Sequence, residues 1–412
     1  MSARLAVLKN GLRVVLAPCE AESVAFGIFV ESGSRHESPS DAGISHFIEH
    51  MLFKGTPTRR PVDITRAIEG RGGNFNAMTG EESTCYYAHL PSEYLADAVE
   101  TLSDMYLNAS IPDDEFAREK QVVIEEIRMY ADEPDAVAAE NLQRALFPDC
   151  PLGAPVAGTP ESLGPMRPST LRRYIRSHYI PSKTVAVIAG SFDESAALAL
   201  MELYLGRQRR GAADFTAEPV DFSRPPVREV NATRDVQQTQ IALGYRTFGI
   251  RDVRKYAATV MDAVLGRGMS SRLFQELRER RGLSYDISSR MQFFSDAGMF
   301  TISAGLDGAK KDLALKTIDR ELKRICDKRV GAAELRRTKE FLVGNFRLAH
   351  ESVRSKMFFY GATMLSFGRL VTPSEQVDGI AAVSAADVQS VAREILSGSN
   401  RSLSTVTGKK QS

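Results

Sequence analysis

The same order of predicted secondary-structure elements occurs twice along this chain. In each half an alternating apolar strand is followed by two helices and a hairpin. The strands are predicted at 24–30 and 239–245, the helices at 41–53, 62–69, 255–265 and 271–280, and the hairpins at 73–90 and 284–306. Later in each half, residues 114–128 align without gaps with residues 333–347. Two related structural units are the simplest account of this repetition.

The arrangement of these elements predicts an α+β fold. Hairpins adjoin helices without regular βαβ alternation, which favours mostly antiparallel sheets with helices packed on one face. Between the two halves, Gly, Pro and charged residues accumulate and the apolar periodicity stops. We therefore predict a domain at 1–208, a linker at 209–226 and a homologous domain at 227–412.

Composition excludes several classes of partner. The 412 residues include 53 Lys and Arg against 52 Asp and Glu, so no basic surface is expected for nucleic acid or anionic lipid. The apolar runs are too short to cross a bilayer, and the first residues lack the apolar core of a signal peptide. The four cysteines are widely spaced and form no C-x-x-C pair, so they suggest neither a redox pair nor a thiolate metal site, and we expect them to be reduced. We expect a cytoplasmic protein that binds neither membrane nor nucleic acid.

The segment HFIEH at 46–50 carries the strongest chemical signal in the sequence. On the predicted helix, His46, Glu49 and His50 gather on one side, and the apolar residues gather on the other. Ser40 or Asp41 is expected to cap the start of this helix. One face of the helix would then pack against the core, while the other presents polar groups.

Two histidines four residues apart lie one helical turn from each other and can bind one zinc ion. The glutamate between them, Glu49, lies in the same arc and can act as a base toward a zinc-bound water. This order inverts H-E-x-x-H and is the inverzincin motif. The alternative is that His46 and His50 are ordinary helix histidines near a surface glutamate.

A catalytic zinc takes three protein ligands, so a third ligand must come from another element. Our candidate is Glu126, which shares a stripe with Glu115 and Glu119 on a helix predicted from about residue 114 to 130. Glu125 points about 100° away from this stripe. The same spacing also fits a solvated acidic face.

With Glu126 following it, the HFIEH motif resembles the M16 metallopeptidase family of insulysin, pitrilysin and the mitochondrial processing peptidases. The resemblance implies a zinc endopeptidase that cleaves peptides or unfolded presequence-like segments. It implies His46, His50 and Glu126 as the zinc ligands and Glu49 as the general base. It also implies that Glu119 supports the site.

Residues 72–87, GGNFNAMTGEESTCYY, resemble the active-site edge strand of this family and its return strand. The resemblance implies that Asn76 and Ala77 bind substrate, since an edge strand can pair with an extended peptide. Considered alone, Gly72, Gly73 and Asn76 would also fit a tight turn.

Residues 277–285, LRERRGLSY, resemble the family's C-terminal Arg/Tyr pair. The resemblance implies that Arg278 and Tyr285 contact substrate and that the tyrosine stabilises the oxyanion. Without the family, the segment would be a basic helix end with a glycine cap.

The second half has lost the metal-binding groups. Aligning the repeats sets Met261, Val264 and Leu265 against the first histidine, the glutamate and the second histidine of HFIEH. It sets Asn345 against the third candidate ligand, Glu126. We therefore expect one zinc ion per chain, bound by the first half.

Family members of this length resemble half of a clamshell that dimerises to close a chamber. A homodimer is therefore expected, with Arg278 and Tyr285 reaching the zinc of the opposite chain. Two alternatives remain open: a catalytic subunit that needs a different, zinc-free partner, and a noncatalytic scaffold subunit of the same fold.

Overall fold

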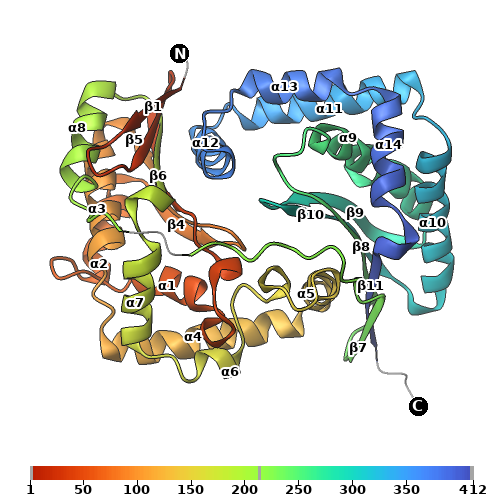
Figure 1. Ribbon diagram of the computed structural model, residues 1–412, viewed down its shortest axis with the longest axis horizontal. Coiled ribbons are helices and arrows are strands. Elements are labelled where there is room, and N and C mark those ends of the chain that lie inside the picture. The colour runs from red at the N-terminus through yellow and green to blue at the C-terminus, as the bar shows by residue number, and fades with distance from the viewer. Residues whose placement is uncertain (1–2, 212–214, 409–412) are drawn as a thin grey trace. The chain divides into compact units, whose positions relative to one another are not determined.

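The computed structural model describes residues 3–211 and 215–408, which form two compact units (Figure 1). The first contains the described residues of Met1–Ile127, Ala154–Glu218 and Arg347–Val371; the second contains those of Arg128–Gly153, Pro219–Phe346 and Thr372–Ser412. Residues 212–214 of the predicted linker, and residues 1–2 and 409–412 of the predicted domains, lie outside the described residues. Each unit combines one sheet with packed helices, which confirms the predicted α+β fold.

The sheet of the first unit has six strands in the order β1-β2-β6-β3-β5-β4. Their bounds are β1 Arg4–Val7, β2 Arg13–Pro18, β3 Ser23–Val30, β4 Asn74–Thr79, β5 Thr84–Pro91 and β6 Thr184–Gly190. Only β2 and β6 pair in parallel; the other neighbours are antiparallel. The central strands β3 and β6 are almost entirely buried, whereas residues along β4 alternate between exposed and half-buried. Strand β4 therefore forms one edge of this sheet.

Helices cover one face of the first sheet and enclose its main apolar core. They are α1 Ile44–Leu52, α2 Pro61–Ile68, α3 Leu95–Asn108, α4 Asp113–Asp132, α6 Pro160–Leu163, α7 Pro168–His178 and α8 Glu194–Tyr204. Phe47 of α1 packs on Phe116 of α4, with ring centroids 4.8 Å apart. This contact fixes the two helices that carry the candidate metal ligands beside each other.

The second unit repeats the plan with a five-stranded sheet in the order β7-β11-β8-β10-β9. The strands are β7 Glu229–Arg234, β8 Thr239–Phe248, β9 Ser284–Phe293, β10 Ala297–Leu306 and β11 Arg401–Gly408. The helices are α9 Lys255–Gly266, α10 Lys311–Asp327, α11 Ala332–Ala349, α13 Pro373–Ala382 and α14 Ala385–Ile395. The predicted hairpin at 284–306 corresponds to β9 and β10, which pair antiparallel.

One helix on the second face of each sheet comes from a distant part of the chain. Helix α12, Val353–Phe367, packs Met357 and Met364 on β3 and β6 of the first unit. Helix α5, Pro134–Leu146, packs Leu142 and Leu146 on the sheet of the second unit. The compact units are therefore discontinuous in sequence, whereas the sequence analysis predicts two contiguous domains separated by a linker at 209–226. Their apolar faces, rather than their sequence positions, decide which sheet each helix covers.

None of the helices in the described ranges is both long enough and apolar enough to pass through a membrane.

Candidate metal centre and active site

Helix α1 is strongly amphipathic, as its sequence predicts. The apolar side chains that it buries completely are Ile44, Phe47, Ile48, Met51 and Leu52. The opposite side carries His46, Glu49 and His50, which are partly exposed. The predicted capping by Ser40 or Asp41 is wrong: the N-cap is Gly43, whose φ of 90° only glycine adopts readily.

The ligand candidates from α1 and α4 meet at one point. The Nε2 atom of His50 lies 3.3 Å from Oε2 of Glu126, and the Nε2 atom of His46 lies 3.9 Å from the same oxygen. These three residues offer donor atoms that all lie within 4.8 Å of one another. Within residues 3–211 and 215–408, no other group of His, Cys, Asp and Glu side chains has this property.

Glu119, which lies about two helical turns before Glu126 on α4, orients the second histidine of the motif, His50. Its Oε1 atom lies 2.9 Å from Nδ1 of His50, and its Oε2 atom lies 2.5 Å from Nζ of Lys54. Burial would raise the pKa of Glu119, but the hydrogen bonds with His50 and Lys54 outweigh it, so that pKa is lowered. The carboxylate therefore stays ionised and keeps Nε2 of His50 directed toward Glu126.

The two histidines have different electrostatic environments. Burial, with the neighbouring His50, lowers the pKa of His46 to about 4, so its ring is neutral at pH 7. Burial would also lower the pKa of His50, but the hydrogen bond to Glu119 and the charge of Glu126 outweigh it and raise that pKa.

This donor set fits zinc. Two imidazole nitrogens and one carboxylate oxygen are the ligands of many catalytic zinc sites, which leave a fourth position for water or substrate. A carboxylate behind one ligating histidine is the usual outer partner of such a site.

Glu49 is held by a residue that the sequence analysis did not select. The hydroxyl of Thr79, the last residue of β4, donates a hydrogen bond of 2.5 Å to Oε2 of Glu49. Burial raises the pKa of Glu49, although this hydrogen bond partly opposes the change. The period-2 alternation of a strand places Thr79 on the same face as Ala77, and this signal could have identified it.

The predicted substrate residues of the first unit lie on the edge strand. Asn76 is exposed, and its Oδ1 atom accepts a hydrogen bond of 2.8 Å from the backbone N–H of Ala77. Ala77 is half-buried and packs against the apolar core. Among the described strands, β4 pairs with β5 alone, so its other edge is available for pairing.

The predicted Arg/Tyr pair comes together in the second unit. The guanidinium carbon of Arg278 lies 4.9 Å from the ring centroid of Phe274 and 4.8 Å from that of Tyr285. Tyr285, at the start of β9, is 77% exposed. The α-helix predicted at 271–280 is instead largely a π-helix, η7 Phe274–Glu279, a form often found at functional sites.

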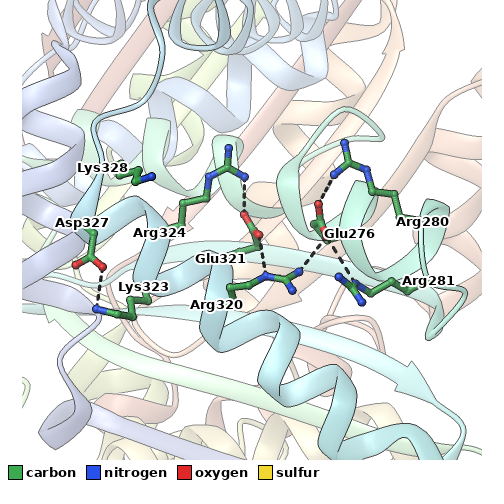
Figure 2. Close-up of a pocket in the computed structure, with 9 residues that line it drawn as sticks. All are labelled: Glu276, Arg280, Arg281, Arg320, Glu321, Lys323, Arg324, Asp327 and Lys328. Carbon is green, nitrogen blue, oxygen red and sulfur yellow. Dashed lines mark hydrogen bonds and ion pairs between the residues drawn. The ribbon is translucent and has the colours of Figure 1, made fainter.

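A buried carboxylate anchors this π-helix (Figure 2). Glu276 accepts hydrogen bonds from Arg280 at 2.5 Å and Arg320 at 3.0 Å, and Arg281 lies 3.7 Å away. These residues line a charged cavity of about 550 Å³. The segment that carries Arg278 is thus tied to helix α10.

The second-half residues that align with the two histidines and the glutamate of HFIEH are ordinary core residues, whereas Asn345, which aligns with Glu126, is exposed. Met261, Val264 and Leu265 lie in α9 and are at most 2% exposed. They pack in the apolar core of the second unit.

Comparisons with known sequences agree with these observations. The family model described as insulinase (peptidase family M16) matches residues 13–160, and that of the peptidase M16 inactive domain matches residues 166–342. An uncharacterized zinc protease of Bacillus subtilis, YmxG, is 34% identical over 388 residues, covering 94% of each chain. An uncharacterized zinc protease of Mycobacterium tuberculosis is 36% identical over 403 residues, covering 96% of this chain and 91% of that protein.

Solved structures share the fold at lower identity. A protease from Helicobacter pylori has a TM-score of 0.94 and 21% identity, covering 98% of this chain and 99% of that chain. A chain of Complex III2 from Candida albicans has a TM-score of 0.87 and 18% identity, covering 98% and 96%. At these identities the structures support the fold alone.

Proposed function

The chain belongs to the insulinase (M16) family of peptidases, and from this premise we propose that it is a zinc-dependent endopeptidase. Its proposed substrates are extended peptides or unfolded, presequence-like segments. One observation carries the proposal: the donor atoms of His46, His50 and Glu126 lie within 4.8 Å of one another, beside Glu49. The names of the relatives as zinc proteases support it further.

Each residue has a role in the proposed hydrolysis. His46, His50 and Glu126 hold the metal, and Glu119 keeps the ring of His50 in position. A bound Zn²⁺ supplies a Lewis acid that lowers the pKa of water to about 7 and polarises the peptide carbonyl. Glu49 accepts the proton of the attacking water and later returns a proton to the leaving amine.

Substrate would bind first through its backbone. The free edge of β4 offers N–H and C=O groups to an extended peptide, which requires little of the substrate's side chains. Asn76 and Ala77 lie in the middle of this edge. We assign Arg278 and Tyr285 to contacts with the substrate carbonyl, because Tyr285 is exposed and the half-buried Arg278 holds its guanidinium donors beside the tyrosine ring.

We further propose one zinc ion per chain and a homodimer in which Arg278 and Tyr285 serve the site of the other chain. The intact ligand set argues against a noncatalytic scaffold role. The family model described as an inactive domain matches residues 166–342, and none of the four groups at the metal centre lies in that range. A catalytic subunit with a different, zinc-free partner is the competing arrangement.

The test is digestion of a mixed peptide library by the purified full chain, with and without a chelator. We expect cleavage that the chelator abolishes, that added Zn²⁺ restores, and that the Glu49→Gln variant lacks. Bound zinc without any cleavage would refute the endopeptidase and favour a scaffold. The native mass of the active sample separates a homodimer from a chain that requires a second subunit.

A further inference from the structure

A short segment at 33–37 places two charged side chains in the interior of the first unit. It contains the 3₁₀ turn η1, Ser34–His36. Arg35 is 2% exposed and Glu37 is 7% exposed. Charged groups are rarely this buried unless they make specific polar contacts, since burial removes their hydration. Their contacts therefore indicate what the segment does.

Glu37 caps the helix that carries the HFIEH motif. Its Oε2 atom accepts a hydrogen bond of 2.7 Å from the N–H of Gly43, and its Oε1 atom accepts one of 2.8 Å from the N–H of Ser45. The first N–H groups of a helix need such acceptors. Gly43 has no side chain to supply one, so a carboxylate from outside the helix does. Ser45 directly precedes His46.

Arg35 holds the turn that follows the edge strand. Its backbone N–H donates to the carbonyl of Glu81 at 2.8 Å, and its guanidinium donates to Oε1 of Glu82 at 2.6 Å. A third bond, of 2.8 Å, runs from the guanidinium to the carbonyl of Glu218. The segment approaches the turn so closely that a Cβ atom on Gly33 would lie 2.2 Å from the carbonyl oxygen of Gly80.

These two contact sets lie on the two elements that one hydrogen bond joins. The turn held by Arg35 begins directly after Thr79, and the helix held by Glu37 carries Glu49. Thr79 and Glu49 are 30 residues apart and belong to different elements. An O–H···O bond requires a separation of about 2.5–3.0 Å, so a small shift of either element breaks it.

We propose that Arg35 and Glu37 are positioning residues that hold the start of α1 and the turn after β4 in register, and so set the Thr79–Glu49 contact. The proposal rests on the proposed function, in which Glu49 is the base. Neither residue needs to touch substrate or metal. A displacement of a reacting group by about 1 Å can cost about 100-fold in rate, which makes such positioning consequential.

The first test needs no activity: hydrogen–deuterium exchange of the full chain, compared with the Glu37→Gln variant. Glutamine keeps the size of the side chain but turns an NH₂ toward one of the two N–H groups. We expect exchange to become about 10-fold faster in residues 43–52 and also faster in residues 77–83. The matched control is Glu31→Gln, which removes a carboxylate paired with Lys183 instead.

The Arg35→Lys variant repeats this test by altering the contact with the turn after β4. It tests the positioning role even if Glu37→Gln does not fold. Lysine keeps the charge but cannot reach two acceptors with one fork. We expect faster exchange in both segments again. Faster exchange confined to the segment that the altered residue touches would overturn the proposal.

The second test is a double-mutant cycle on peptide hydrolysis. We expect Glu37→Gln to lower kcat about 10-fold with KM within twofold, and to add little when Thr79→Val is already present. If kcat of the double variant instead fell by about 100-fold, the two substitutions would act independently, and this would contradict positioning through Thr79 and Glu49. If the parent chain hydrolyses nothing, the proposed function fails, and the exchange experiment still decides the positioning role.

Discussion

His50 and Glu119 share a contact of 2.9 Å between Nδ1 and Oε1, which determines the nitrogen of His50 that faces Glu126. The same carboxylate also binds Lys54, so its charge is shared between an imidazole and an ammonium group. The geometry of the candidate metal centre therefore depends on a residue outside the proposed ligand set.

Loss of the Glu119 carboxylate should weaken metal binding. Removing such an outer partner typically lowers affinity 10- to 100-fold, and we expect this range for Glu119→Gln. Competition with a chromophoric chelator measures the zinc affinity. Glu115→Gln on the same helix is the control, and an unchanged affinity in Glu119→Gln would contradict the assigned role.

Glu49→Gln should retain zinc and lose hydrolysis. A general base contributes about 10²- to 10⁴-fold to rate, and an amide cannot take the proton. Zinc content and kcat measured on one preparation test this prediction. The exposed residue Glu69 supplies a control, Glu69→Gln, and appreciable turnover by a zinc-loaded Glu49→Gln chain would exclude Glu49 as the base.

Thr79→Val should lower kcat with little change in KM. The substitution keeps the shape but removes the hydroxyl that holds Glu49, and hydrogen bonds to charged groups contribute about 1.5–3 kcal/mol. We therefore expect a loss of at least about 10-fold in kcat. Thr79→Ser restores the hydroxyl and should recover most activity; equal loss in both variants would point to packing instead.

The stability of the first unit should depend on the titration of His178. Its ring stacks between Tyr174, at 3.7 Å, and Phe215, at 4.0 Å, and burial lowers its pKa to about 4. The unfolded histidine has a pKa of about 6.5, so between pH 6.5 and 4 the unfolded chain binds a proton that the folded chain does not. Stability must therefore fall as pH falls through this window.

In His178→Phe, denaturant unfolding should show a flatter pH dependence over the same window. Allowing for the partial exposure of His178, we expect the parent to lose about 1–2 kcal/mol more unfolding free energy than the variant over this pH window. The phenyl ring keeps the stacking but loses the hydrogen bonds of His178, so the slope with pH is compared rather than the absolute stability. If the unfolding free energy of parent and variant changed equally with pH, the assigned role of His178 would be refuted.

Mixing two inactive chains tests whether sites are shared between subunits. An Arg278→Ala chain lacks one proposed substrate contact, and a Glu49→Gln chain lacks the proposed base. If Arg278 serves the opposite chain, the heterodimer contains one intact site and should recover up to about half of the parent activity per dimer. Confirmed heterodimers without any recovery would favour action within one chain.

The sequence determined whatever depends on local periodicity. The 3.6-residue repeat places His46, Glu49 and His50 on one face of α1, and the same repeat aligns Glu119 with Glu126 on α4. Alternation with a period of two likewise predicted the hairpins of both units. Such patterns follow from backbone geometry, so they are visible without any knowledge of the fold.

Only the tertiary structure decided how separate elements meet. The cap of α1 comes from Glu37 rather than from Ser40 or Asp41, and the partner of Glu49 is Thr79 on an edge strand. Helices α5 and α12 cover sheets that their positions in the chain do not suggest. Each of these contacts joins groups that are distant in sequence or lie on different elements. Many residues offer equivalent donors, acceptors or apolar faces, and only packing selects among them.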